Sequence, residues 1–133
     1  MAITKNYNRQ CLAMAVVMIS LADIVDGGAV QPAVELPDGA IVTGGSVLVT
    51  EVFNAATTAT LDLGDAADED RYTATPLDLK TLGAKALIPS GYVMPNKGDI
   101  LATYASTGAA ATTGALTLVV EYIDIQKSEW TQG

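Results

Sequence analysis

The densest group of residues able to do chemistry in this sequence is an acidic segment at 62–70. Asp62, Asp65, Asp68, Glu69 and Asp70 lie within it, and carboxylate oxygens are the hard ligands that calcium prefers. Their spacing does not fit the D-x-[DN]-x-[DN]-G loop of an EF-hand. A solvated turn at the end of a strand explains the same residues. We expect a plain turn and no metal site, and calcium binding at Asp65 to Asp70 stays an open alternative.

Residues for nucleophilic or acid–base catalysis are scarce. The sequence has no histidine, which removes the most common general base and zinc ligand. The single thiol, Cys11, opens an apolar run without a histidine to activate it, so we expect it to be buried and inert. A carboxylate-dependent hydrolase would need aromatic sugar platforms, and five Tyr, one Trp and one Phe make these scarce. We expect no enzyme activity and no cofactor.

Short glycine and serine motifs do not change this expectation. Gly27-Gly28 and Gly44-Gly45 match neither a Walker loop nor a dinucleotide-binding fingerprint. Ser90-Gly91 lacks the G-x-S-x-G context of a hydrolase nucleophile. These motifs therefore indicate turns and bulges.

The charge balance limits the partners. Fifteen acidic and seven basic residues give a net charge of −8, and the basic residues are scattered, whereas phosphate contacts need them clustered. The most apolar run, residues 11–25, is interrupted by Ser20 and Asp23 and is too short to span a bilayer. Lys5 and Arg9 only faintly resemble the start of a signal peptide, and no clear cleavage site follows. We expect neither nucleic acid nor a membrane as a partner.

Alternating patterns predict the strands that must position these residues. Leu61 and Leu63 alternate with polar neighbours, and residues 115–125 show the cleanest alternation in the chain, typical of a central strand. Residues 40–53 are long for one strand, and Gly44-Gly45 predicts a bulge that lets it pass between two sheets. Neither face of this strand is cleanly polar, so we expect one face to meet the core and the other a partner.

Other segments predict shorter elements. Residues 11–25 fit a helix or a strand, and we favour a strand with its methionines in the core, because Gly27-Gly28 closes it. Pro32 places residues 30–36 at a sheet edge or beside a bulge. The remaining predictions are a strand at 72–79 broken at Pro76, short strands at 86–89 and 92–94, a turn at 95–98 and a hairpin loop at 106–114.

Many short strands separated by Gly and Pro turns predict an all-β fold, an antiparallel β-sandwich. We expect one sandwich domain at residues 11–125, an N-terminal arm at 1–10 and a C-terminal tail at 126–133. The arm is either a frayed terminus or a segment that orders against a neighbouring subunit. Tyr7, Arg9 and Trp130, which lie in these polar termini, are the candidate partner-contact residues.

Two stretches carry a resemblance to a known family. LPDGAIVTGGSVLVTEVFNAATTATLDLGDAADEDRY, residues 36–72, and DILATYASTGAAATTGALTLVVEYI, residues 99–123, look like the head decoration or cement proteins of tailed bacteriophages. The shared features are a proline-glycine turn into a V-x-V strand, the F-N-A loop, the L-x-L-G-D turn with its acidic run and Tyr72, and a final strand ending in V-V-E-Y. Residues 1–28 lie outside the resemblance.

The resemblance implies a jelly-roll or similar sandwich, often trimeric, that sits on the capsid exterior and clamps neighbouring subunits of the major capsid protein. It implies a virion location on the capsid surface after assembly in the host cytoplasm. The partners would be the major capsid protein and further copies of this chain. The alternative from the binding class is a phage fibre, a knob, or a receptor- or carbohydrate-binding module with a similar sandwich.

Overall fold

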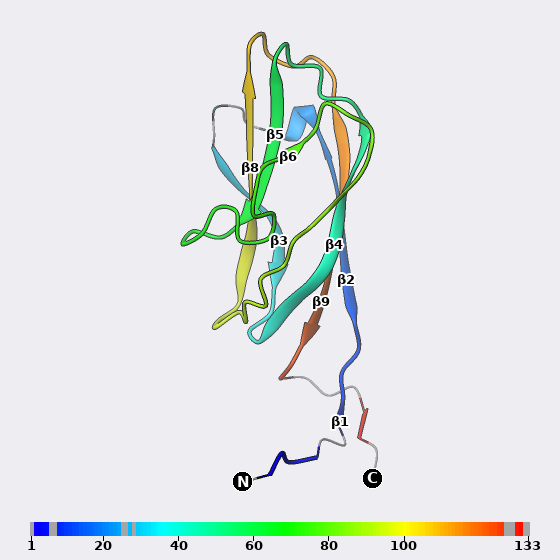
Figure 1. The fold of residues 1–133 in the computed structure, drawn as a ribbon, viewed down its shortest axis with the longest axis vertical. Helices are drawn as coiled ribbons and strands as arrows, with labels where there is room; N and C mark the ends of the chain where they lie inside the picture. The colour runs from blue at the N-terminus through cyan, green and yellow to red at the C-terminus, as the bar shows by residue number, and fades with distance from the viewer. Residues whose placement is uncertain (1, 6–7, 25–26, 28, 127–129, 132–133) are drawn as a thin grey trace.

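The computed structural model describes residues 2–5, 8–24, 27, 29–126 and 130–131. In these residues the regular elements are strands apart from one short 3-10 helix, η1 (Figure 1). In chain order they are β1 (Asn8–Arg9), β2 (Ala13–Ser20), η1 (Leu21–Asp23), β3 (Val30–Leu36), β4 (Ala40–Glu51), β5 (Thr58–Gly64), β6 (Leu77–Asp78), β7 (Gly83–Ala86), β8 (Gly98–Thr107), β9 (Ala115–Asp124) and β10 (Trp130–Thr131). The predicted all-β fold is confirmed. None of the described segments forms a helix long and apolar enough to cross a membrane.

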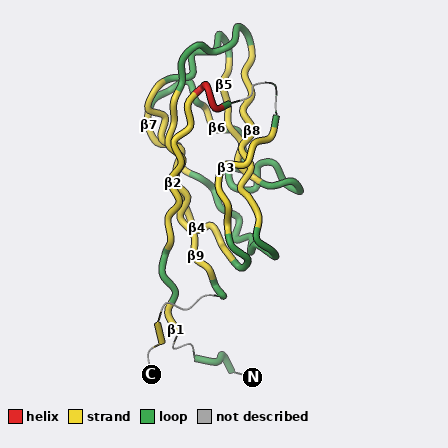
Figure 2. Tube along the Cα trace, turned by 180° about the vertical axis from the view of Figure 1, so that it is seen from behind, coloured by secondary structure: helices red, strands yellow, loops and turns green. Residues whose placement is uncertain are grey.

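Two four-stranded sheets form the body of the molecule, and their strand orders are β2-β9-β4-β7 and β3-β8-β5-β6. All neighbouring strands are antiparallel. Successive strands from β2 to β9 lie in opposite sheets, except β5 and β6, which pair with each other. Eight strands wound in this way form a jelly roll, the sandwich variant that was expected. Seen from behind, η1 lies at the end of the body opposite the two termini (Figure 2).

The core lies between the two sheets and consists mainly of aliphatic side chains from alternate strand positions. On β9, Leu116, Leu118 and Val120 are buried, and on β5, Leu61 and Leu63 are buried. Side chains in a strand point alternately to the two faces of its sheet. Both alternations predicted from the sequence are therefore confirmed.

A bulge in β4 changes which of its side chains point into the core. Before the bulge Val42 is buried and after it Val47 is buried, because the pairing with β9 shifts between Val42 and Gly44. Gly45 has a φ of +135°, and a Cβ at this position would lie 2.2 Å from the carbonyl oxygen of Val119, so the position requires glycine. The predicted bulge is confirmed. The predicted passage between sheets is wrong, because β4 continues its ladder with β9 on both sides of the bulge.

The two strands ahead of β4 also agree with their sequence patterns. Residues 13–20 form β2, which confirms the strand assignment there, and η1 then ends the strand. Pro32 lies in β3, an edge strand, and the pairing with β8 shifts between Pro32 and Val34. Proline cannot donate to a sheet ladder, so an edge strand with a bulge accommodates it.

The predicted strand at 72–79 is mostly a turn. The N–H groups of Thr73 and Ala74 donate to the carbonyl of Asp70 at 3.1 and 2.8 Å, and Ala74 has a φ of 61°. Only β6 pairs in this region, with two residues of β5. Tyr72 and Leu79 are both buried at the ends of this segment, so the chain between these two anchors bends instead of extending.

Three further predictions in the second half of the chain are wrong. The strand predicted at 86–89 lies earlier, as β7, because residues 83–86 are the ones that pair with β4. The strand predicted at 92–94 is a single bridge between Val93 and Ile41. The loop at 106–114 joins β8 and β9, which lie in opposite sheets, so it is not a hairpin. The turn predicted at 95–98 is present and leads into β8.

Candidate functional site

The two termini meet in a small sheet outside the sandwich. β1 and β10 pair antiparallel, with Asn8 opposite Thr131 and Arg9 opposite Trp130. We call this pair the terminal ribbon; it lies beyond the end of the body at which β2 begins and β9 ends (Figure 1). Two of the three predicted contact residues, Arg9 and Trp130, are thus strand partners, whereas Tyr7 lies outside the described residues.

Charge is segregated between the ends of the chain and the body. Residues 1–12 and 125–133 carry three basic residues and one acidic residue, a net charge of +2. Residues 13–124 carry four basic and fourteen acidic residues, a net charge of −10. Carboxylates of a neighbouring molecule are therefore repelled by the body and attracted to the ends. The overall charge of −8 hides this asymmetry.

A row of large apolar side chains stands out on the outer face of β2 and at the residue just before it. Leu12, Met14 and Val16 are each 57% exposed, and Met18 is 81% exposed. We call these four residues the β2 flank. The intervening side chains, such as Val17, are partly buried because they face the other sheet. A contiguous exposed apolar row of this kind indicates a protein interface.

The exposure of Cys11, Met14 and Met18 corrects two predictions. The methionines of β2 were expected in the core, but Met14 and Met18 are exposed because the outer face of β2 is uncovered within this chain. Cys11 was expected to be buried, but it is exposed, in the short segment between β1 and β2. A partner-facing apolar side was also expected on β4; its outward residues Ile41 and Leu48 are half buried within the single chain, and a partner at this face stays a prediction.

The acidic turn is held together by the guanidinium group of Arg71. Asp65 Oδ2 accepts a hydrogen bond from Arg71 Nε at 2.5 Å, and Asp65 Oδ1 accepts from the N–H groups of Ala67 and Asp68 at 3.0 and 2.9 Å. The guanidinium of Arg71 lies 3.7 Å from the ring centroid of Tyr92, a cation–π contact. Among the described residues, no group of three or more Cys, Asp or Glu side chains could hold a metal ion.

Two partly buried carboxylates of this region, Asp62 and Asp65, have pKa values shifted in opposite directions. Burial raises the pKa of Asp65, but the hydrogen bonds from Arg71 and from backbone amides outweigh it, so that the pKa lies below its ordinary value. Burial raises the pKa of Asp62, and the hydrogen bond from the Thr73 hydroxyl offsets this only in part. Asp65 therefore stabilises the turn as an anion.

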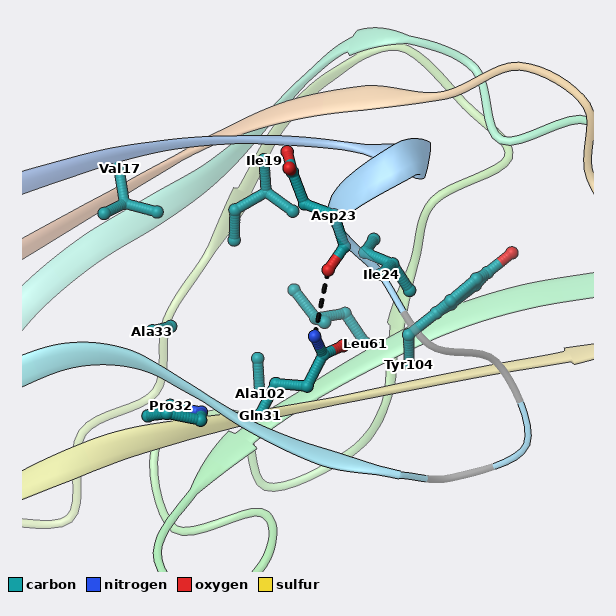
Figure 3. A pocket seen from close by; sticks show the side chains of 10 residues that line it. All are labelled: Val17, Ile19, Asp23, Ile24, Gln31, Pro32, Ala33, Leu61, Ala102 and Tyr104. Carbon is teal, nitrogen blue, oxygen red and sulfur yellow. Dashed lines mark hydrogen bonds between the residues drawn. The ribbon is translucent and has the colours of Figure 1, made fainter.

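A cavity of about 130 Å³ opens between β2 and β3 (Figure 3). Gln31 Nε2 donates a hydrogen bond across it to the carbonyl of Asp23 at 2.9 Å. The N–H and hydroxyl of Ser20 donate to the Asp23 carboxylate, which lowers the pKa of Asp23 and makes it a weak base. The lining of the cavity is mostly apolar and consists of Val17, Ile19, Asp23, Ile24, Gln31, Pro32, Ala33, Leu61, Ala102 and Tyr104.

The tip of the body opposite the ribbon is cross-linked by side chains. Asn54 Oδ1 accepts hydrogen bonds from the N–H groups of Thr112 and Thr113 at 2.7 and 3.1 Å, and Asn54 Nδ2 donates to the Thr112 hydroxyl at 3.0 Å. Next to it, Phe53 packs edge to face on Tyr104 with ring centroids 5.6 Å apart. The F-N-A loop thus joins the 106–114 loop to the end of β4 and fixes both.

These features define a jelly-roll protein with a basic terminal ribbon and an apolar flank. Two solved structures share its fold over most of both chains. A chain of the cyanophage Pam1 capsid asymmetric unit has 21% sequence identity and a TM-score of 0.67, covering 92% of this chain and 91% of that one. A chain of the acidic stable capsid structure of Helicobacter pylori bacteriophage KHP30 has 18% identity and a TM-score of 0.63, covering 87% and 92%. No protein-family model and no curated protein matches the sequence.

Proposed function

We propose that this chain is a non-enzymatic structural protein of a phage virion, which binds the capsid exterior and stabilises contacts between subunits of the major capsid protein. The observation that carries the proposal is the match of the whole jelly roll to chains of two phage capsid structures, over about nine tenths of each chain. The turns and strands that resemble phage decoration proteins come from the same jelly roll and add a second argument.

The build of the body suits a clamp. Its tip is fixed by Asn54, its acidic turn by the ion pair of Arg71 with Asp65, and its core by side chains from both sheets. A rigid body keeps the surfaces that it offers in a constant relative position. A protein that binds the assembled lattice and not the free subunits stabilises the lattice by mass action.

The terminal ribbon is the proposed attachment element. It extends from one end of the body (Figure 1). The basic residues of the termini attract carboxylates on a partner, whereas the acidic body repels the same carboxylates. Arg9 and Trp130, as strand partners in the ribbon, and Tyr7 next to it in sequence are the proposed contact residues. Several copies, in a trimer, would stand on the capsid surface, after assembly in the host cytoplasm.

The test starts from intact heads purified from infected cells. The chain is sought in the heads by mass spectrometry, then stripped from them, and the temperature at which the heads release DNA is measured. We expect the chain on the heads and a lower release temperature after stripping. Finding the chain only on tails, or binding of purified chain to glycans, would favour a fibre or receptor-binding module. Unchanged heat resistance of stripped heads would overturn the clamp.

A further inference from the structure

We infer that the β2 flank, Leu12, Met14, Val16 and Met18, is the surface through which copies of this chain associate with one another. The inference deepens the proposed function, on which it rests for the orientation of the body. The partner that binds this surface is a second copy of this chain.

The flank has the apolar character that such an interface requires. Its four side chains are 57–81% exposed in the single chain, and association is the means by which an exposed apolar row leaves water. The same outer face continues across the sheet. Val16 lies opposite Val119 of β9, and Met18 lies opposite Thr117, which lies opposite Leu48 of β4.

The distribution of charge favours a second copy of this chain as the partner of the flank. Residues 13–124 carry a net charge of −10, so two bodies repel each other wherever carboxylates would meet. Residues 11–22 carry no charged side chain. The flank itself therefore adds no like charges to the contact when two identical acidic bodies approach over it. At its margins, Glu121 lies opposite Met14 in the sheet, and Asp23 follows in η1.

The position of the flank in the fold supports the same partner. β2 is an edge strand that runs along the length of the body, from the ribbon end to η1 (Figures 1 and 2). If the ribbon attaches the body to the capsid, this flank faces sideways, where neighbouring copies stand. Pairing along an edge strand is also a common route by which sheets of different chains associate.

The test compares two double variants that make the same change of charge on the same outer face. Val16→Lys with Met18→Lys alters the flank, and Thr43→Lys with Thr50→Lys alters exposed positions of β4. The oligomeric state of each purified full-length chain is measured by sedimentation over a range of concentrations. Thermal melts verify that each variant folds. The ionic strength is also varied, because salt screens repulsion between acidic bodies.

The unaltered chain and the Thr43/Thr50 variant should form the same oligomer, strengthened by salt. The Val16/Met18 variant should be a folded monomer, with association weakened by more than about tenfold. An unaltered chain that stays monomeric, or an oligomer that persists in the folded Val16/Met18 variant, would overturn the inference. Loss of head binding with the oligomer intact would also overturn it, because the flank would then face the capsid. An oligomer that never binds heads would contradict only the proposed function.

Discussion

Arg9 and Trp130 lie opposite each other in the antiparallel pair of β1 with β10, although they come from opposite ends of the chain. Their pairing turns two polar termini into one ribbon at the end of an acidic jelly roll. Because the ribbon lies outside the sandwich, its removal should affect binding to heads without affecting the folding of the body.

Deleting residues 1–10 should weaken binding to heads by more than about tenfold while the body keeps its melting temperature. The deletion removes β1 and two basic residues, and none of the described residues in this segment belongs to the core. Binding is measured by cosedimentation with heads at increasing salt, which should weaken the interaction of the intact chain. Lys97→Gln is the control, because Lys97 lies in the body and its ion pair with Glu35 is exposed. Equal binding of the deletion variant and the intact chain would show that the ribbon does not attach the chain to heads.

Asn54→Ala should destabilise the body by about 1.5 kcal/mol. The side chain of Asn54 makes three hydrogen bonds to Thr112 and Thr113, which join the two loops at the tip. The measurement is urea denaturation. Asn96→Ala serves as the matched control at an exposed position and should stay within about 0.5 kcal/mol of the unaltered chain. Similar losses in both variants would show that the tip is not fixed by Asn54.

Gly45→Ala should cost about 3 kcal/mol of stability, because its Cβ would meet the Val119 carbonyl at 2.2 Å in the bulge of β4. Gly91→Ala separates the clash from backbone strain. Gly91 has a φ of +80° and open space around its Cβ position, so its replacement should cost about 1 kcal/mol. Equal costs in thermal or urea denaturation would contradict the close approach of β4 and β9 at the bulge.

Asp65→Asn should cost about 1.5–3 kcal/mol at pH 7, since it removes a charged acceptor from Arg71 and two backbone amides. The pKa of Asp65 is lowered from 3.8 in the folded chain, so its stabilisation is present above pH 3.8 and is lost as the pH falls through the lower, folded pKa. The variant and the unaltered chain should therefore converge in stability below pH 3.8. Urea denaturation at pH 7 and at about pH 3 measures this difference.

Asp62→Asn is the control for that pH dependence. The pKa of Asp62 is raised by burial, so its ionisation opposes folding above the folded pKa, and its effect on the pH dependence has the opposite sign. This variant should lose no stability at pH 7. A convergence with pH like that of Asp65→Asn would mean that the two carboxylates have been assigned wrongly.

Elements marked by strict alternation or by a glycine pair were predicted well from the sequence. The alternation of Leu116, Leu118 and Val120 gave β9, and Gly44-Gly45 gave the bulge of β4. The terminal ribbon was missed because strands of two residues, such as Asn8–Arg9, are too short to show a period. Two termini rich in polar residues were the available signal, and they do not indicate that the ends pair.

The flank was missed for a different physical reason. β2 has apolar residues on both faces, and the sequence does not tell which face a second sheet covers. The methionines were assigned to the core on their apolar character alone, but β3 and β8 cover only the face of Val17 and Ile19. A strand that is apolar on both faces therefore predicts either a double cover or an interface, and the fold decides between them.

The most direct test of the central claim is an add-back measurement on heads prepared without this chain. Purified chain is added at increasing concentration, and bound chain and the temperature of DNA release are measured on the same heads. Saturable binding with a rise in the release temperature is the predicted result. Absence of binding, or saturable binding with no change in the release temperature, would contradict a structural protein that stabilises the capsid.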